Sequence, residues 1–200
     1  IKYCSEKLGV NLSHKNIKEI TNTVKNNFQG TKEILHKENL TIFSEYGDLV
    51  FLLGDTFDTS IQEITLANNN QFNWGIFTFE LKELTKSDFE KEYTEYTNYD
   101  AILYFDKSEI IPPIKVRTPN PGDRILLSKR GNGKKLKDLL IDKKIPQNSR
   151  KLVAVITDRE KIIGIISPPG KSGFLLRSDS TTYISASTKS VICIKISFNS

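Results

Sequence analysis

Lysine and arginine side chains are concentrated between residues 115 and 151, where their chemistry is suited to binding anions. This stretch holds twelve Lys and Arg against three Asp, in a chain of 200 residues whose net charge is +5. Residues 38–114 hold fifteen acids against four Lys. A change of sign along the chain is typical of a local binding surface for a polyanion, although dense charge is more often only a solvated surface.

Two arginines flank the sequence Pro121-Gly122-Asp123. Pro fixes φ, Gly accepts a positive φ, and Asp bonds nearby backbone amides, so these three residues predict a tight turn. Arg117 precedes the turn on one strand and Arg124 follows it on the next, an arrangement that lets both point the same way. The planar fork of arginine suits phosphate oxygens and base edges.

A glycine-rich basic loop follows this turn, and a short amphipathic helix follows the loop. The loop resembles a phosphate site that leads into a helix, but it lacks the Walker A pattern, so a nucleoside triphosphate site is only weakly supported. We expect the helix over Lys134–Lys144, with Leu136, Leu139 and Leu140 on one buried stripe and Pro146 ending it. Such a helix would dock on a sheet and present cations to a nucleic-acid backbone.

The residues predicted to bind the polyanion come from the turn, the loop, the helix and the strand that follows. They are Arg117, Arg124, Lys129, Arg130, Lys134, Lys135, Lys137, Lys144 and Arg150. The alternative is that the helix is only a solvated lysine-rich element, whose Asp138 and Asp142 partly offset the charge.

The elements that must position these residues are mostly short strands, which gives an α+β fold with mixed or antiparallel strands and one or two packed helices. A helix is predicted from the Ser13 cap to Gly30, with Ile17, Ile20, Val24 and Phe28 on the stripe that packs or binds a partner. Strands are predicted across 33–81 and 101–105, and then at 114–117, 124–127, 152–157, 162–166, 174–176, 183–186 and 191–196. Thr85–Asp100 is predicted to be an exposed helix or a long loop.

The carboxylates, cysteines and histidines of the sequence lack the neighbouring residues that an active site or a metal site would need. Asp88, Glu90, Glu92 and Glu95 have no His or nucleophile beside them, which argues against a carboxylate active site, and no nucleophile–His pair supports a hydrolase. Cys4 and Cys193 are expected to be free thiols in a reducing cytosol, and His14 and His36 lack metal-ligand spacing. No apolar run is long enough to cross a bilayer, and no signal peptide is recognisable, so we expect no membrane partner.

The stretch from Ile114 to Arg150, with "IKVRTPNPGDRI" and "GNGKKLKDLLIDKKIP", resembles the C-terminal signature of the tRNA(Ile)-lysidine synthetase family. Weaker similarity continues upstream through Gly30, Tyr46-Gly47, Trp74-Gly75 and "LYFDKSEI". The chain departs from the family pattern at Pro119 or Asn120, where the family has a second arginine. "ISPPGKSGFLLR" is a looser match, so Lys171 and Arg177 carry less weight than the residues named above.

The resemblance implies a role in tRNA recognition within a ligase. In the family, ATP activates C2 of the wobble cytidine of a minor isoleucine tRNA with a CAU anticodon, and lysine then displaces AMP. That chemistry, with ATP and Mg, belongs to an N-terminal domain with a Ser-Gly-Gly-x-Asp-Ser loop, a motif that is absent from this sequence. We therefore expect no cofactor in this chain, no activity of the chain alone, and recognition of the acceptor stem in the cytoplasm. A stand-alone module that binds structured RNA is the alternative.

The resemblance also implies a fold similar to the B3/B4-type domain shared by tRNA synthetases and this family. Together with the prolines at 112 and 113, it predicts three regions: the end of a helical domain (1–30), an acidic strand-rich subdomain (31–112) and a basic tRNA-recognition subdomain (113–200). The chain opens on Ile and contains no Met, which predicts that it was cut from a longer protein. The sequence leaves a homodimer open.

Overall fold

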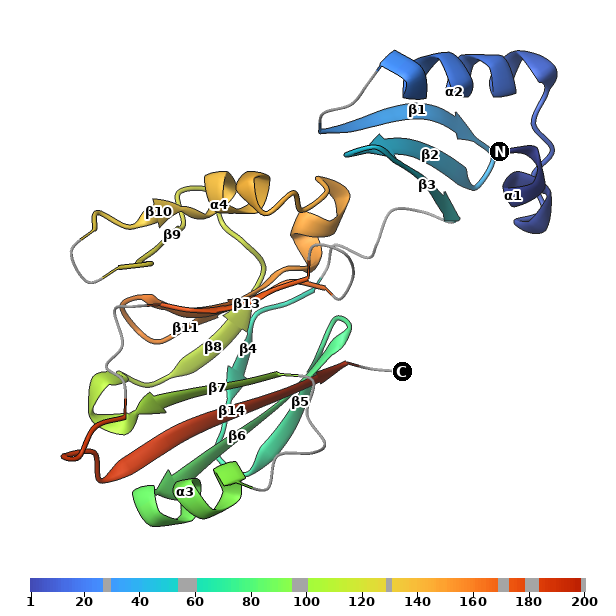
Figure 1. The fold of residues 1–200 in the computed structure, drawn as a ribbon. Helices are drawn as coiled ribbons and strands as arrows, with labels where there is room; N and C mark the ends of the chain where they lie inside the picture. The colour runs from blue at the N-terminus through green and yellow to red at the C-terminus, as the bar shows by residue number, and fades with distance from the viewer. Residues whose placement is uncertain are drawn as a thin grey trace. The chain divides into compact units, whose positions relative to one another are not determined.

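The protein forms two compact units, each with its own core. The computed structural model describes residues 1–26, 30–53, 61–94, 101–128, 131–168, 173–178 and 184–198. One unit comprises residues 1–60 and 144–149, and the other comprises 61–143 and 150–200. Their sheets are antiparallel and carry few helices (Figure 1), which confirms the predicted α+β class. In the described part of the chain, no helix is long and apolar enough to span a membrane.

The first unit packs a helix on a three-stranded meander. Its elements are α1 (Lys2–Lys7), α2 (His14–Asn26), β1 (Thr31–Lys37), β2 (Leu40–Glu45) and β3 (Asp48–Leu53). Ser13 Oγ accepts the Asn16 N–H at 3.2 Å and begins α2 as predicted. Ile20 of α2 packs with Leu40 and Ile42 of β2, and all three are fully buried. Phe28, also predicted on this stripe, lies outside the described residues.

The second unit contains a five-stranded sheet, a four-stranded sheet and a small hairpin. The five-stranded order is β13 (Leu175–Arg177), β12 (Ile162–Ile166), β11 (Ala154–Thr157), β8 (Ile114–Arg117), β4 (Ile64–Leu66). The four-stranded order is β5 (Asn70–Trp74), β6 (Phe77–Thr85), β14 (Ser190–Phe198), β7 (Ala101–Asp106). The hairpin is β9 (Arg124–Ile125) with β10 (Lys134–Lys135). The helices are α3 (Lys86–Thr94), α4 (Leu136–Asp142), and the 3-10 turns η1 (Lys107–Glu109) and η2 (Asn148–Leu152).

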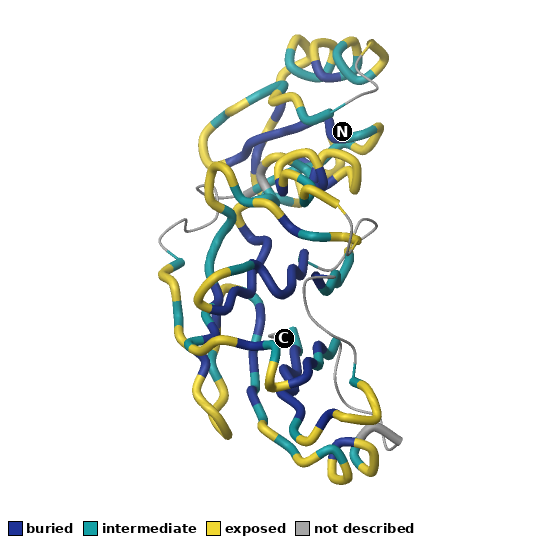
Figure 2. The backbone as a smooth tube through the Cα atoms, turned by 90° about the vertical axis from the view of Figure 1, so that its left-hand side faces the viewer, coloured by how far each residue is buried: buried dark blue, intermediate teal, exposed yellow. Residues whose placement is uncertain are grey.

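The core of the second unit lies between its two large sheets. Val116, Ile156 and Ile163 face the four-stranded sheet, where Phe79 and Phe105 complete the same buried cluster. Figure 2 shows the buried backbone following these strands. Because strand side chains alternate between faces, Lys115, Arg117 and Thr157 must lie on the opposite face of the five-stranded sheet. That outer face carries the candidate site.

The structure differs from the sequence prediction around the basic helix and near the C-terminus. Helix α4 begins at Leu136 rather than Lys134, because Lys134 and Lys135 pair with β9 as a short strand. The helix is also shorter than predicted, since it ends at Asp142. Residues 184–186 do not form the predicted strand; they begin a turn in which the Ser185 N–H donates to Thr188 Oγ1 at 3.0 Å. Tyr183 lies outside the described residues.

The compact units do not coincide with the three regions predicted from the sequence. The division at residue 30 separates α2 from the strands that it packs on, and the division at 112 separates β4 from its partner β8. Both divisions cut across packing between strands or between a helix and a sheet, which local composition does not encode. The functional roles assigned to the three regions stay predictions.

Replacing Gly164 with Ala should destabilise the second unit by about 1–3 kcal/mol, because the sheets approach closely there. An added Cβ would lie 2.6 Å from Leu103 Cδ1 across the core. Trp74, the one tryptophan of the chain, is buried in this unit, so its fluorescence during denaturant unfolding measures the loss. In a Leu103→Val background, which shortens the opposing side chain, the penalty should be smaller. Equal penalties in both backgrounds would show that the contact is not the cause.

Candidate nucleic-acid interface

The β9–β10 hairpin places two exposed cations directly opposite each other. In its register, Arg124 pairs with Lys135 and Ile125 pairs with Lys134. Directly paired residues share a face, and like charges in that position destabilise a hairpin. Arg124 and Lys135 are both exposed, whereas Ile125 is fully buried on the other face. The two cations therefore form a site where a bound anion would relieve repulsion.

Backbone carbonyls orient Arg124 without neutralising it. Its Nε and Nη2 donate to the Asn132 carbonyl at 3.3 and 3.2 Å, and Nη2 also donates to the Gly133 carbonyl at 2.8 Å. A carbonyl oxygen is a dipole and carries no net charge, so the guanidinium keeps its charge while its direction is fixed. This is a preorganised arrangement for binding a phosphate.

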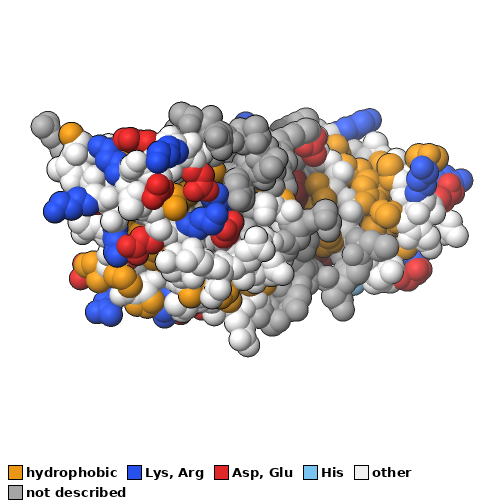
Figure 3. All heavy atoms as spheres, turned by 90° about the horizontal axis from the view of Figure 1, so that it is seen from below, with side chains coloured by type: hydrophobic (Ala, Val, Ile, Leu, Met, Phe, Trp, Pro, Cys, Tyr) orange, Lys and Arg blue, Asp and Glu red, His pale blue; other side chains and the backbone are white. Residues whose placement is uncertain are grey.

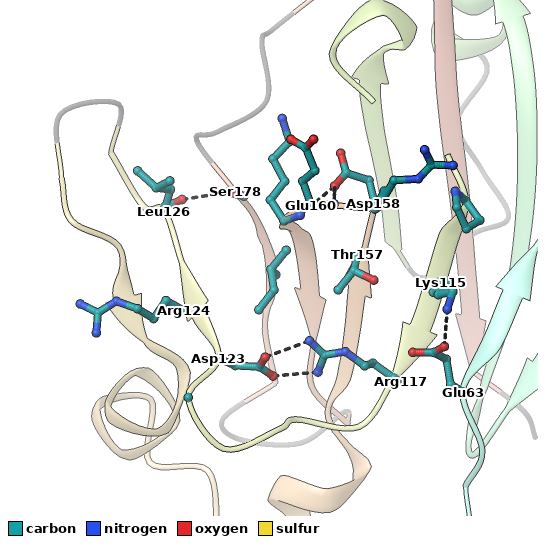
Figure 4. Close-up of a pocket in the computed structure, with 15 residues that line it drawn as sticks. Glu63, Lys115, Arg117, Asp123, Arg124, Leu126, Thr157, Asp158, Glu160 and Ser178 are labelled. Carbon is teal, nitrogen blue, oxygen red and sulfur yellow. Dashed lines mark hydrogen bonds and ion pairs between the residues drawn. The ribbon is translucent and has the colours of Figure 1, made fainter. Parts of the chain in front are cut away.

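Arg117, by contrast, is held by a carboxylate. Its Nη1 and Nη2 donate to Oδ2 and Oδ1 of Asp123, both at 2.8 Å, and Nη1 also donates to the Thr118 carbonyl at 2.9 Å. The Arg117 and Asp123 side chains are only 17% and 11% exposed. The two arginines thus have separate partners, and Figure 4 shows the Arg124 fork directed away from the Arg117–Asp123 pair. An RNA contact for Arg117 stays a prediction.

The predicted turn is present, and Asp123 closes it. Gly122 has φ +91°, and the Asn120 N–H donates to Asp123 Oδ2 at 2.7 Å. Burial raises the pKa of Asp123, but the hydrogen bonds from Arg117 and Asn120 and the Arg117 charge outweigh it and hold the pKa below 3.8. The carboxylate is therefore ionised throughout the physiological range.

Helix α4 buries the predicted leucine stripe and leaves one lysine beside the hairpin. Leu136, Leu139 and Leu140 are each at most 3% exposed. Lys137 is exposed on the helix, whereas Lys134 pairs with Asp142 of the same helix. Together with Arg124 and Lys135, Lys137 completes a set of three exposed cations, which we call the hairpin cations.

The other predicted binding residues are placed differently. Arg150 is half-buried in η2 and already engaged within the protein. Lys144 is exposed and belongs to the first unit, whereas the hairpin belongs to the second. Lys129 and Arg130 lie outside the described residues.

A pocket of about 640 Å³ opens on the outer face of the five-stranded sheet, beside the hairpin (Figure 4). Sequence reasoning missed several of its residues, although the alternation of β8 was a signal that Lys115 and Arg117 share a face. The lining residues are Glu63, Pro113, Lys115, Arg117, Gly122, Asp123, Arg124, Leu126, Thr157, Asp158, Arg159, Glu160, Lys161, Ile162 and Ser178. They come from segments far apart in the sequence, which only the fold brings together.

The described acids of the segment 85–100 have partners within the protein. Asp88 accepts from the Thr85 hydroxyl at 2.7 Å at the start of α3, and Glu92 pairs with the buried Lys195. Figure 3, which views the molecule from below, shows Lys and Arg interspersed with Asp and Glu.

Burial raises the pKa of Cys193 to about 11, so this thiol is protonated at neutral pH and is a poor nucleophile.

Comparison with known proteins points to one family. The family model described as the TilS substrate C-terminal domain matches residues 114–183. Residues of this chain are 43% identical over 56 residues to the bifunctional protein TilS/HprT of Listeria monocytogenes, covering 28% of this chain and 9% of that protein. They are 31% identical over 88 residues to the tRNA(Ile)-lysidine synthase of Geobacillus kaustophilus, covering 44% and 19%.

The fold is similar to that of a solved structure. The crystal structure of a TilS C-terminal domain superposes with a TM-score of 0.50 at 21% identity, covering 70% of this chain and all of that one. The similarity includes the whole of that domain. The matches to full-length relatives span less than a fifth of each relative named above.

Replacing Asp123 with Asn should cost about 2 kcal/mol of unfolding free energy at neutral pH, because the charged fork of Arg117 loses its partner. The folded pKa of Asp123 is depressed, so its contribution is present above about pH 4 and is lost as pH falls through the folded value. The difference between parent and variant, measured by Trp74 fluorescence in denaturant, should therefore shrink in acid. Asp138→Asn, an exposed change on α4, should stay within about 0.5 kcal/mol of the parent. A difference between Asp123→Asn and the parent that did not change between pH 7 and pH 3 would contradict this account.

Proposed function

Because residues 114–183 match the family model of the TilS substrate C-terminal domain, we propose that this chain is the tRNA-binding C-terminal region of a tRNA(Ile)-lysidine synthetase. The hairpin cations hold the tRNA backbone, and the acceptor stem is the part that they grip. The single observation that carries this proposal is the cross-strand pair of Arg124 and Lys135, two exposed cations that the fold holds side by side.

The geometry supports contact with a phosphate backbone more than sequence reading. Arg124 has a fixed direction and keeps its charge, and Lys135 and Lys137 add two exposed cations beside it. Helical RNA is recognised mainly through its shape, its phosphates and its 2′-hydroxyls, because side chains cannot read its deep major groove. A small cationic hairpin meets those requirements.

The chemistry is assigned to the catalytic domain of the full-length ligase. There, ATP and Mg activate C2 of the wobble cytidine in tRNA(Ile) with a CAU anticodon, and lysine displaces AMP to form lysidine. In this proposal the present chain positions the tRNA in the cytoplasm and supplies no reacting group. The protonated Cys193 and the structural partners of Asp88 and Glu92 support that assignment.

The double variant Arg124→Ala/Lys135→Ala should bind tRNA about tenfold more weakly than the parent, because two phosphate contacts are lost. The slope of log affinity against log salt should fall by roughly 0.7–0.9 for each lost contact, which binding titrations across a salt series measure. Lys189→Ala, an exposed lysine before β14, is the matched control and should leave the slope unchanged. Equal affinity and slope in the double variant and the parent would mean that the hairpin cations are only a solvated surface.

The chain alone should form no lysidine when it is given ATP, lysine and tRNA, because the reacting groups are assigned to another domain. Nucleoside analysis of the recovered tRNA by mass spectrometry measures this. Lysidine above the level of a protein-free reaction would contradict the assignment of the chemistry.

A further inference from the structure

The pocket beside the hairpin contains a buried hydroxyl that has no hydrogen-bond partner among the described residues. Thr157 lies on β11, lines the pocket and is 9% exposed. Its side chain makes no hydrogen bond with any described residue. A buried polar group left unpaired costs about 1–3 kcal/mol, so such a group facing a cavity indicates something that binds there. Figure 4 shows Thr157 within the ring of polar side chains that line the pocket.

The lining of the pocket carries five Lys and Arg side chains and four Asp and Glu side chains, so its charges nearly balance. Glu63 pairs with Lys115 at 2.7 Å, and Asp123 pairs with Arg117. Asp158 accepts the backbone N–H groups of Glu160 at 2.9 Å and Lys161 at 2.8 Å, and it is only 4% exposed. With Glu63 and Asp123 each paired with a cation, the lining offers a phosphate little net positive charge.

The same lining suits a nucleobase. Pro113, Leu126 and Ile162 offer apolar surface to the faces of a flat ring, while Thr157 and Lys115 offer hydrogen bonds to its edge. A base edge is uncharged and carries both donors and acceptors, which fits a lining of mixed polarity. The cavity volume of about 640 Å³ lies in the range of small-ligand sites.

The pocket is continuous with the hairpin cations. Arg124 lines it, yet its fork is directed outward to the Asn132 and Gly133 carbonyls. An RNA strand held by its phosphates at Arg124 therefore has the pocket within reach of its next base. The Arg124 charge, which no carboxylate offsets, is directed outward, whereas the charges of the whole lining nearly balance. This arrangement suits a phosphate at Arg124 and a base inside the pocket.

We propose that this pocket binds one unpaired nucleobase of the RNA whose backbone the hairpin cations hold, with the Thr157 hydroxyl bonded to the base edge. This proposal rests on the proposed RNA-binding function. It adds a subsite specific for single-stranded RNA to a surface that otherwise grips a helical backbone. Unpaired bases splayed from the stack are the part of RNA that proteins can read directly.

The test compares a blunt RNA hairpin with the same hairpin carrying a single-stranded 3′ extension of mixed sequence. The parent chain should bind the extended hairpin more tightly in fluorescence anisotropy titrations. Thr157→Val keeps the shape and removes the hydroxyl, so it should reduce this preference about two- to tenfold. Its unfolding midpoint, read from Trp74 fluorescence, should be unchanged or higher, because a buried unpaired group is removed. Thr65→Val, an exposed change on β4 of the same sheet, should leave the preference intact.

A second variant tests the pocket by filling it. Leu126→Trp should abolish the preference for the extension while leaving the affinity for the blunt hairpin unchanged. Equal binding of both RNAs by the parent would overturn the pocket proposal and leave the backbone contact standing. A full preference retained in Thr157→Val and Leu126→Trp would also overturn it, since the extension would then bind elsewhere. Binding of neither RNA by the parent would instead reject the proposed function and this subsite with it.

Discussion

The contacts of Asp123 connect every element on which the candidate interface depends. Its carboxylate holds the Arg117 fork of β8 and the Asn120 amide of the turn. Its backbone carbonyl accepts the N–H of Leu136 at 2.8 Å, the first residue of α4. One residue thus links the five-stranded sheet, the turn that starts β9 and the helix after β10. Because the pair is mostly shielded from solvent, its hydrogen bonds are stronger than those of an exposed pair.

The two arginines around this turn differ in their hydrogen-bond partners, and the partner determines whether the charge remains available to a ligand. Arg117 is oriented and neutralised by a carboxylate, so it serves the fold. Arg124 is oriented by two carbonyls and keeps its charge, so it can serve a ligand. Arg117 and Arg124 are seven positions apart. Their roles differ because one guanidinium binds a charged carboxylate and the other binds uncharged carbonyl oxygens. The same distinction separates Lys134, which pairs with Asp142, from its neighbour Lys135.

The strands of the five-stranded sheet direct alternate side chains to its packed face and to the outer face that carries the site. One face of β8, β11 and β12 is packed against the four-stranded sheet, where Gly164 permits an approach too close for a Cβ. The opposite face carries Lys115, Arg117 and Thr157, which are held in place by the backbone of a fully packed sheet. A binding surface on such strands is positioned more rigidly than one on loops, which suits recognition by shape.

The sequence alone determined the features that depend on neighbouring residues. These include the turn at Pro121–Asp123, the leucine stripe of α4, the strands around Ile114 and Ile162, and the basic segment that carries the family resemblance. Each follows from backbone preferences or from a periodicity visible within about ten residues. For that reason the fold class could be predicted before any contact was known. The family was predicted separately, from the resemblance of the basic segment.

Only the tertiary structure decided which cations remain available and what lies beside them. The pairing of Arg124 with Lys135, the neutralisation of Arg117 and the burial of the Thr157 hydroxyl all depend on distances between residues that the chain brings together from separate segments. The pocket likewise joins residues between Glu63 and Ser178. Local propensities carry no information on such distances, and strand register, which sets them, is fixed by the packing of the whole sheet.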